Sequence, residues 1–310
     1  YMCPGRSDEN CKGCKALGAH VEEKENTVHI TTGPEGLHGA RIFFDLVSVG
    51  ATINVLLAAV KAKGLTIMEN VAREPEIVDL ATFLNNMGAH IRGAGTNEIR
   101  VQGVDSLKSM NVHTIIPDRI EAGTYLSFAA ANGNGVLVKN VITEHLDPFL
   151  SKLEEMGVRM EIDEDEIYVP CGDVLSPVNI KTSPFPGFAT DLQQPITPLL
   201  MQARGSSTII DTLYPERTKH IPEMQRMGAK ISSKDGIITV GHSTDLSGTV
   251  VEAGEIRAGV SLVGLALMAK GTTVINKADN ILRGYDRIVE KFRGLSVDLE
   301  VINESESLNH

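Results

Sequence analysis

Residues 74–103 read EPEIVDLATFLNNMGAHIRGAGTNEIRVQG, and this stretch defines the structural repeat from which the chain is built. In its first half Ile77, Leu80 and Leu84 recur at helical spacing, so the pattern predicts an amphipathic helix over 74–88 with one buried stripe. In its second half, short alternating runs flank a turn that is rich in glycine and asparagine. That arrangement predicts a β-hairpin.

The Met-Gly pair that ends this helix recurs along the chain. Leu-Gly or Met-Gly pairs have their glycines at Gly18, Gly88, Gly157 and Gly228, which lie 70, 69 and 71 residues apart. A fifth related stretch carries Ser296 at the glycine position, 68 residues after Gly228. Amphipathic helices are also predicted before the later members of this series, at 145–157, 217–228 and 285–295.

A second helix, with almost no polar face, is predicted before each amphipathic helix. Each helix is rich in Ala and Leu and ends at a Gly, after which a Val-, Ile- or Thr-rich strand follows. Helix and strand together span 49–71, 121–141, 192–213 and 257–278. A helix that is apolar all round has to be buried. A repeat of about 70 residues cannot bury such a helix well by itself, so the repeats should share their helices.

The sequence therefore predicts an α/β fold made of repeated β-α-β-α-β-β modules, with sheets outside and buried helices inside. The chain holds four such modules and a fragment at its start. Its length of 310 residues predicts two domains, which we place at 1–112 and 113–310. We expect the first domain to be incomplete and its apolar helix at 51–62 to be partly uncovered.

Composition excludes several classes of function. The net charge is −11, no basic run is present, and aromatic residues make up only 4% of the chain with no Trp, so we expect no nucleic-acid partner. No apolar run approaches the roughly 18 residues that a membrane helix needs, so we expect no membrane insertion. The start of the chain is polar, and four cysteines do not make a disulfide scaffold in a chain of this length. We expect a cytoplasmic, reducing environment.

Several long strings, in the same order along the chain, resemble the enolpyruvyl transferase family. They are FFDLVSVGATIN (43–54), ENVAREPEIVDLATFLNNMGA (69–89), IIPDRIEAGTY (115–125), PGFATDLQQPITPL (186–199), YPERTKHIPEMQRMGA (214–229), EIRAGVSLV (255–263) and RGYDRIVEKF (283–292). They are most similar to the branch of UDP-N-acetylglucosamine 1-carboxyvinyltransferases. The resemblance implies an inside-out α/β barrel with two domains of three repeats each and a catalytic cleft between them.

The resemblance also implies a reaction and its substrates. The family transfers enolpyruvyl from phosphoenolpyruvate to the 3′-hydroxyl of UDP-N-acetylglucosamine and releases phosphate, the first committed step of peptidoglycan synthesis. We expect no cofactor and only small-molecule partners. The alternatives are a 3-phosphoshikimate enolpyruvyl transferase, or a truncated paralogue that only binds nucleotide sugar or a partner protein. The family's N-terminal third, with its Lys-Asn pair, has no counterpart here, so we expect low activity from the 310 residues alone.

Asp191, in FATDLQQP, is the candidate general base or hydroxyl-binding group. A carboxylate within hydrogen-bond reach of the attacking hydroxyl is what the reaction requires. The alternative is a helix N-cap, which is a frequent role for Asp before an apolar helix, and both roles are compatible.

Arg217, Arg257 and Arg283 are the candidate anion ligands, in YPER, EIRAG and ILRGY. We place all three at helix starts or just before them. A cation there is unfavourable with respect to the helix dipole unless an anion is shared with the helix N–H groups. The resemblance assigns the three to the phosphate and carboxylate of phosphoenolpyruvate, and a solvated surface arginine is the alternative for any one of them.

Ser48, Val49 and Gly50 precede the first apolar helix, where backbone N–H groups could hold the UDP diphosphate. The alternative for Ser48 is an ordinary N-cap. The family often has Lys where Leu46 stands. The resemblance places Leu213 in the nucleotide site, with core packing as its alternative, and Arg6 nearest to the arginine of the catalytic loop.

Two further groups receive a structural interpretation. Acidic residues at helix starts, in REPE (73–76) and PDRIE (117–121), are favoured by the helix dipole without any catalytic role, although Asp118 and Arg119 could face the cleft. Cys11 and Cys14 form a CxxC pair, but no further ligands follow at metal-binding spacing, so we expect no metal.

Overall fold

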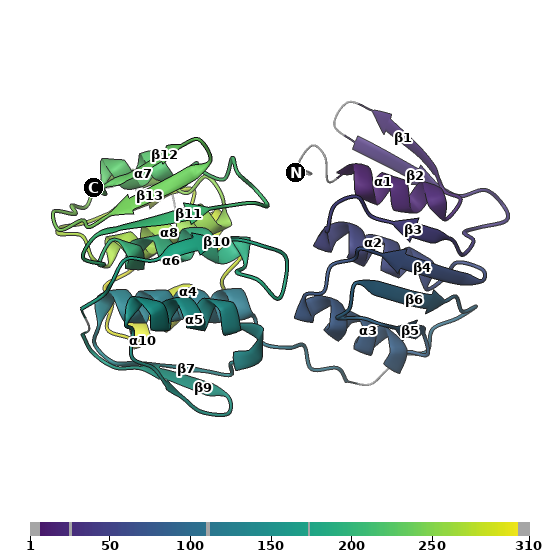
Figure 1. Ribbon diagram of the computed structural model, residues 1–310, viewed down its shortest axis with the longest axis horizontal. Helices are drawn as coiled ribbons and strands as arrows, with labels where there is room; N and C mark the ends of the chain where they lie inside the picture. Colours follow the sequence, from purple (N-terminus) through teal and green to yellow (C-terminus); the bar gives the residue numbers. More distant parts are fainter. Residues whose placement is uncertain (1–6, 25–26, 110–111, 173, 303–310) are drawn as a thin grey trace. The chain divides into compact units, whose positions relative to one another are not determined.

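The structure of the chain is a computed structural model that describes residues 7–24, 27–109, 112–172 and 174–302. The chain divides into two compact units. The first consists of Tyr1–Ile116 with Pro184–Pro186, and the second consists of Pro117–Ser183 with Gly187–His310. Figure 1 shows both units, with labels on most of their helices and strands.

The first unit begins with a helix and a hairpin and continues with a four-stranded sheet that carries two helices. Its elements are α1 (Ser7–Ala16), β1 (His20–Lys24), β2 (Thr27–Thr31), β3 (Arg41–Phe43), α2 (Val49–Ala59), β4 (Leu65–Glu69), α3 (Pro75–Asn86), β5 (His90–Arg92) and β6 (Glu98–Gln102).

The second unit mixes single strands and hairpins with helices along the chain. Up to its centre it contains α4 (Arg119–Asn132), β7 (Val136–Lys139), η1 (Thr143–His145), α5 (Asp147–Met156), β8 (Glu161–Ile162), β9 (Glu166–Val169), β10 (Asn179–Lys181), η2 (Thr190–Leu192) and α6 (Gln193–Leu200). It continues with β11 (Ser206–Ile210), α7 (His220–Arg226), β12 (Ile231–Lys234), β13 (Ile237–Gly241), β14 (Val250–Glu252), α8 (Ile256–Ala266), β15 (Val274–Asn276), α9 (Asp279–Leu282) and α10 (Ile288–Gly294).

The repeat is visible in the sheet topology. In the first unit the strand order is β3-β4-β6-β5, and in the second unit it is β10-β11-β13-β12. In both sheets the first two strands are parallel and joined through an apolar helix, and the last two form an antiparallel hairpin. The same parallel pairing, again across an apolar helix, joins β14 to β15. The module predicted from the sequence is therefore confirmed.

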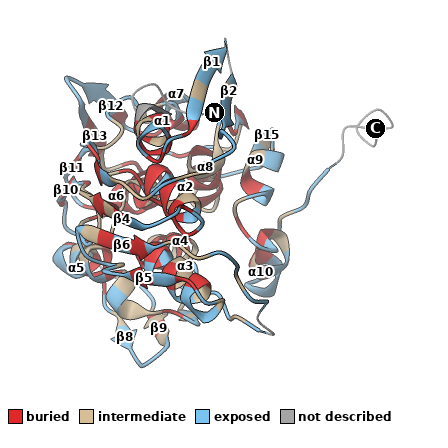
Figure 2. Ribbon diagram, turned by 90° about the vertical axis from the view of Figure 1, so that its right-hand side faces the viewer, coloured by how far each residue is buried: buried red, intermediate tan, exposed pale blue. Residues whose placement is uncertain are grey.

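The apolar helices of the second unit form its interior. Every residue of α6 is buried, and eight consecutive residues of α8 are buried. Helix α6 packs against both α4 and α8. Figure 1 shows α4 and α6 between the sheet of β10–β13 and the sheet of β7–β9, and Figure 2 shows the burial of α6 and α8. Helices inside and sheets outside are the expected inside-out arrangement, although the described strands form separate sheets and none closes into a barrel.

The repeated glycine has a conformational reason. Gly88, Gly157 and Gly228 follow α3, α5 and α7 with φ near +90°, in the left-handed region that favours glycine. In each case the glycine N–H and the next N–H bond back to the helix carbonyls, which satisfies groups left over at the helix end. Ser296 follows α10 with the same pair of bonds and a φ of 62°, so the fifth member keeps the geometry without the glycine.

The ends of the second unit depart from the predicted module. Among the described residues of the second unit, no strand precedes α4 and no hairpin follows α10. The helix expected over 285–295 begins only at Ile288, because Arg287 lies in the left-handed region with φ 45°. The partly uncovered helix expected in the first unit is α2, whose Leu57 is 45% exposed although Val55, Leu56 and Ala59 are buried.

Candidate active site

Three segments of the second unit bring together one carboxylate and two guanidinium groups. Asp191 lies in the short helix η2, Arg217 in the loop before α7, and Arg257 in the first turn of α8. Nη1 of Arg217 lies 2.7 Å from Oδ1 of Asp191, and Nη2 of Arg257 lies 3.4 Å from Oδ2. Both arginine side chains are largely buried, whereas the Asp191 side chain is 38% exposed to solvent.

Asp191 does not cap the apolar helix that follows it. The N-cap position of α6 is Leu192, and it makes no side-chain cap hydrogen bond. Residues Thr190–Leu192 instead form a turn of 3₁₀-helix, from which the Asp191 carboxylate reaches the two guanidinium groups. The N-cap alternative is therefore wrong, because both carboxylate oxygens are used in ion pairs.

The ion pairs set the protonation of Asp191. Burial is the largest single influence on this carboxyl group and raises its pKa, but the charges and hydrogen bonds of Arg217 and Arg257 together outweigh it. The net result is a pKa below the ordinary value. Asp191 is thus ionised at neutral pH, and it bridges one arginine from the loop before α7 and one from the first turn of α8.

Arg257 is held in place by an aromatic ring. Its guanidinium lies 5.4 Å from the ring centroid of Tyr285, a fully buried residue whose hydroxyl is 3.0 Å from Oγ1 of Thr124. Nη1 of Arg257 is buried and has no hydrogen-bond partner among the described residues. A buried guanidinium donor without an acceptor is a suitable ligand for an anionic substrate.

Arg217 is positioned by the turn that follows β11. Its Nη1 also donates to Oγ1 of Thr190 at 3.1 Å, and its guanidinium lies 4.7 Å from the ring centroid of Tyr214. The turn itself is organised by Asp211, which accepts hydrogen bonds from the hydroxyls of Thr182 and Thr190 and from two backbone N–H groups of the turn.

Sequence reasoning missed Asp211. The available signal was an aspartate directly after a strand and before a turn, where such a side chain often accepts backbone N–H groups. Its side-chain partners lie 21 and 29 residues away in the sequence, so their identity could not be read from local spacing.

The prediction for Arg283 is wrong in one respect. Arg283 occupies the C-cap position at the end of α9, not a helix start, so its charge is favourable with respect to the helix dipole and needs no shared anion. Its side chain is exposed, and among the described residues the ion pairs of Asp191 come from Arg217 and Arg257. Convergence of all three arginines on Asp191 is therefore not observed.

Leu213 lies in the turn between β11 and α7, and its N–H donates to Asp211. It is partly buried. This places it two residues after the carboxylate that organises the Arg217 loop. Its assignment to a nucleotide site remains a prediction.

In the first unit the N-cap alternative for Ser48 is confirmed. Ser48 is the N-cap of α2, and its hydroxyl accepts from the N–H of Ala51 at 3.3 Å. Val49 and Gly50 follow in the exposed first turn, and a side chain added at Gly50 would meet open space. The helix start thus has room for a ligand, while Arg6 lies outside the described residues.

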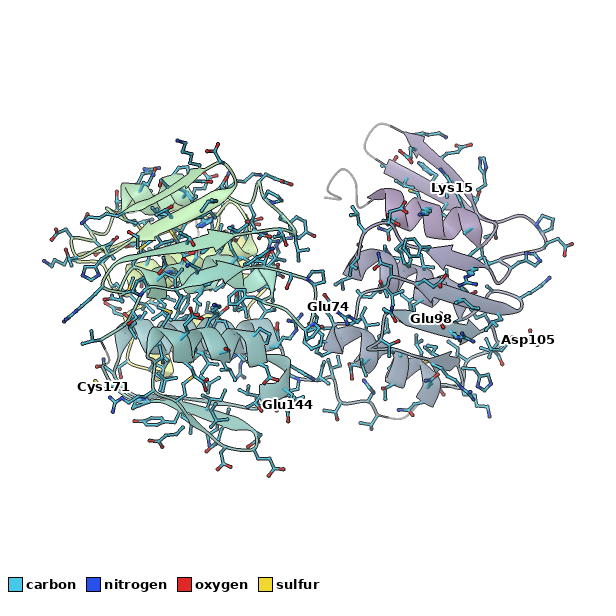
Figure 3. All side chains as sticks on the ribbon, viewed as in Figure 1. Lys15, Glu74, Glu98, Asp105, Glu144 and Cys171 are labelled. Atoms are coloured by element: carbon cyan, nitrogen blue, oxygen red, sulfur yellow. The ribbon has the colours of Figure 1, made fainter. Side chains whose placement is uncertain are left out.

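The acidic residues at helix starts are structural where their contacts are known. Asp118 is the N-cap of α4 and accepts from the N–H groups of Ile120 and Glu121. Glu74, labelled in Figure 3, occupies the N-cap position of α3 without a side-chain cap bond. The charge of Asp118 also acts on Arg257 and Tyr285, so this helix start lies electrostatically near the active-site arginine.

The described residues contain neither a metal-binding cluster nor a membrane-spanning helix. No three His, Cys, Asp or Glu side chains gather there in a geometry that could hold a metal ion. No helix in the same residues has both the length and the apolar composition to cross a membrane.

The fold is the one expected of an enolpyruvyl transferase, and the comparisons with known proteins show that family. The family of EPSP synthase (3-phosphoshikimate 1-carboxyvinyltransferase) matches residues 8–292, and the chain belongs to this family. Within it, the chain is 60% identical over 303 residues to UDP-N-acetylglucosamine 1-carboxyvinyltransferase 2 of Lactiplantibacillus plantarum, covering 98% of this chain and 71% of that protein. It is 57% identical to the enzyme of the same name from Latilactobacillus sakei, covering 97% of this chain and 72% of that protein. The UDP-N-acetylglucosamine branch is therefore the one to which this chain is assigned.

Solved structures agree on the fold. The enolpyruvyl transferase NikO from Streptomyces tendae superposes with a TM-score of 0.83 at 23% identity, covering 95% of this chain and 72% of that one. EPSP synthase from Acinetobacter baumannii superposes with a TM-score of 0.67 at 19% identity, covering 96% of this chain and 72% of that one. These likenesses support the fold only, because the sequences have diverged far.

Proposed function

We propose that this chain transfers enolpyruvyl from phosphoenolpyruvate to the 3′-hydroxyl of UDP-N-acetylglucosamine with release of phosphate. The observation that carries the proposal is the ionised Asp191 held between Arg217 and Arg257 in a chain that is 60% identical to a transferase named for that acceptor. We place the reaction in the cytoplasm. Both substrates are small charged molecules. No resident metal or cofactor is required by this chemistry.

The two arginines supply the charge that the anionic substrate needs. Arg217 and Arg257 stay protonated, because their negative neighbours offset the effect of burial on each pKa. Guanidinium groups suit phosphate and carboxylate through two parallel hydrogen bonds. The unpartnered Nη1 of Arg257 is available for such a bond without breaking any other.

Asp191 is the group that receives the proton of the attacking hydroxyl. With both arginines paired to it, its low pKa makes it a weak base. When an anionic substrate takes over the two guanidinium groups, the charges that lower this pKa are partly neutralised and the carboxylate becomes more basic. Binding of phosphoenolpyruvate would therefore prepare Asp191 for proton abstraction.

In the first unit, the start of α2 is the proposed diphosphate site. The N–H groups of Val49 and Gly50 lie in the first turn of an eleven-residue helix, where the dipole favours negative charge. Ser48 uses its hydroxyl as a cap, so it contributes through its backbone. Arg283, Leu213 and Arg6 complete the proposed set of substrate contacts.

The proposal is tested by titrating the chain with UDP-N-acetylglucosamine, phosphoenolpyruvate and shikimate 3-phosphate in a calorimeter, with phosphate release as a second measurement. We expect UDP-N-acetylglucosamine to bind and shikimate 3-phosphate not to bind. Asp191→Asn should reduce any transfer by about 10²–10⁴-fold, the usual contribution of a general base. Binding of shikimate 3-phosphate but not of the nucleotide sugar would overturn the assignment of the acceptor.

A further inference from the structure

A buried polar cluster lies beside the active site, and the proposed reaction does not use it. Gln194, His220 and Glu255 form the cluster; Gln194 and His220 are completely buried and Glu255 is partly buried. Nε2 of Gln194 lies 2.8 Å from Oε1 of Glu255 and 3.2 Å from Nδ1 of His220. A single amide nitrogen therefore joins three helices, α6, α7 and α8.

The cluster comes from the same three segments as the active site. Gln194 lies three residues after Asp191, and His220 lies three residues after Arg217. Glu255 lies two residues before Arg257. Each pair shares one helix start, so the Gln194 side chain links the three backbone segments from which the ion-paired side chains project.

The protonation states of the cluster follow from its hydrogen bonds. A carboxylate only accepts hydrogen bonds, so the Gln194 atom that faces Glu255 is the amide nitrogen. The same nitrogen faces Nδ1 of His220, which must then accept and carry no proton. Burial, with the charge of Arg217, lowers the pKa of His220 to about 3, so the ring stays neutral. Both Gln194 hydrogens are then used, and turning the amide round would set its oxygen against the Glu255 carboxylate.

We propose that Gln194, His220 and Glu255 are positioning residues that hold Arg217, Asp191 and Arg257 at the spacing needed to bind the anionic substrate. The proposal deepens the proposed function and rests on it. His220 acts as a neutral acceptor that fixes the Gln194 amide, and Gln194 fixes the start of α8. Glu255 adds a negative charge that stabilises the guanidinium of Arg217.

The neighbouring Gln193 provides a matched control. It is the same residue type, it is completely buried and it lies on the same helix turn. Neither of its side-chain polar atoms has a hydrogen-bond partner among the described residues. Gln194→Leu and Gln193→Leu therefore remove the same atoms from the same helix, and only the first breaks the link between the helix starts.

Two measurements on the whole chain separate positioning from general stability. One is the pKa of the Asp191 carboxyl, followed by carbon NMR, and the other is the dissociation constant of phosphoenolpyruvate, measured by calorimetry. We expect Q194L to raise the Asp191 pKa towards its ordinary value and to weaken phosphoenolpyruvate binding by about tenfold, since a small misplacement of binding groups has large effects. Q193L should change neither.

A second pair of variants tests the acceptor role of the histidine. His220→Leu removes the acceptor and should reproduce Q194L. His220→Asn places a side-chain oxygen near the position of Nδ1 and should restore the wild-type Asp191 pKa. This pair decides the question if Q194L does not fold.

Each outcome supports or overturns one statement. Equal effects of Q194L and Q193L on both measurements would overturn the positioning role while leaving the proposed function intact. Absence of phosphoenolpyruvate binding in the wild-type chain would overturn the proposed function. In that case the Asp191 pKa of the four variants still shows whether the cluster sets the geometry of the ion pairs.

Discussion

Replacing Asp191 with Asn removes the charge from the centre of the site and keeps the shape of the side chain. A buried charge-assisted hydrogen bond contributes about 1.5–3 kcal/mol. The Asp191 side chain is 38% exposed, so solvent screening reduces this contribution. We therefore expect D191N to lower the free energy of unfolding of the second unit by about 1–2 kcal/mol at pH 7.

The stability difference between wild type and D191N should decrease as the pH is lowered. The pKa of Asp191 is lowered in the folded chain, so its contribution is complete above the ordinary carboxyl pKa of about 4. It is lost as the pH falls through the lower pKa of the folded state. The stability difference between wild type and D191N should thus be equal at pH 7 and pH 5 and should shrink towards pH 3.

Urea denaturation followed by tyrosine fluorescence measures this difference. Four of the five tyrosines lie in the second unit, and the chain has no tryptophan. With a urea dependence of about 2 kcal/mol per molar, the midpoint should fall by about 0.5–1 M at pH 7. The control is Glu164→Gln, which removes an exposed negative charge that makes no ion pair among the described residues and should leave the midpoint in place. A midpoint shift that is the same at pH 7 and pH 3 would refute the electrostatic argument.

Three further changes have defined expectations. Ser48→Ala removes the cap bond to Ala51 and should lower the stability of the first unit by about 1 kcal/mol in urea melts read by circular dichroism. Ser296→Gly removes the strain of a non-glycine residue in the left-handed region and should raise the melting temperature of the second unit by a few degrees, equivalent to about 1 kcal/mol. A melting temperature below that of the wild type would contradict the strain argument. Tyr285→Phe removes the bond to Thr124 and should lower the urea stability by about 1 kcal/mol. Tyr285→Leu should lower it further, because the ring beside the active-site arginine is lost as well.

The repeated architecture was predictable because it rests on short-range patterns. Helices without a polar face have to be buried, and α2, α4, α6 and α8 form where the sequence places them. The Met-Gly pairs mark helix ends because the backbone there is left-handed. That conformation favours glycine at one position, so the helix end can be read from a single residue. The ends of the second unit were less predictable, since Arg287 adopts a left-handed conformation that its residue type does not favour.

The active site was predictable only in part. Asp191, Arg217 and Arg257 came from the resemblance, and their ion pairs follow from the packing of α6, α7 and α8. The misplacement of Arg283 arose because a short helix, α9, precedes it, and the sequence pattern gave no sign of that helix. Gln194 carries a signal that could have been used, since two adjacent glutamines open a helix that is otherwise apolar. Most buried polar groups are hydrogen-bonded, and the partners of Gln194 are supplied by two other helices.

Repetition also explains why residues so far apart in the sequence share one site. The parallel pairs β10-β11 and β14-β15 place α6 and α8 in the same sense, so the starts of these two helices come to the same end of the second unit. The charge of Asp118, at the start of α4, acts on Arg257 in the first turn of α8. Asp118, Asp191 and Arg257 lie at or next to those three starts. A cation in the first turn of α8 is unfavourable with respect to the helix dipole, and in the free protein Asp191 offsets that charge. An anionic substrate that replaces Asp191 on the arginines would satisfy the same electrostatic requirement, and it would free the carboxylate for the role proposed above, in which it takes the proton of the attacking hydroxyl.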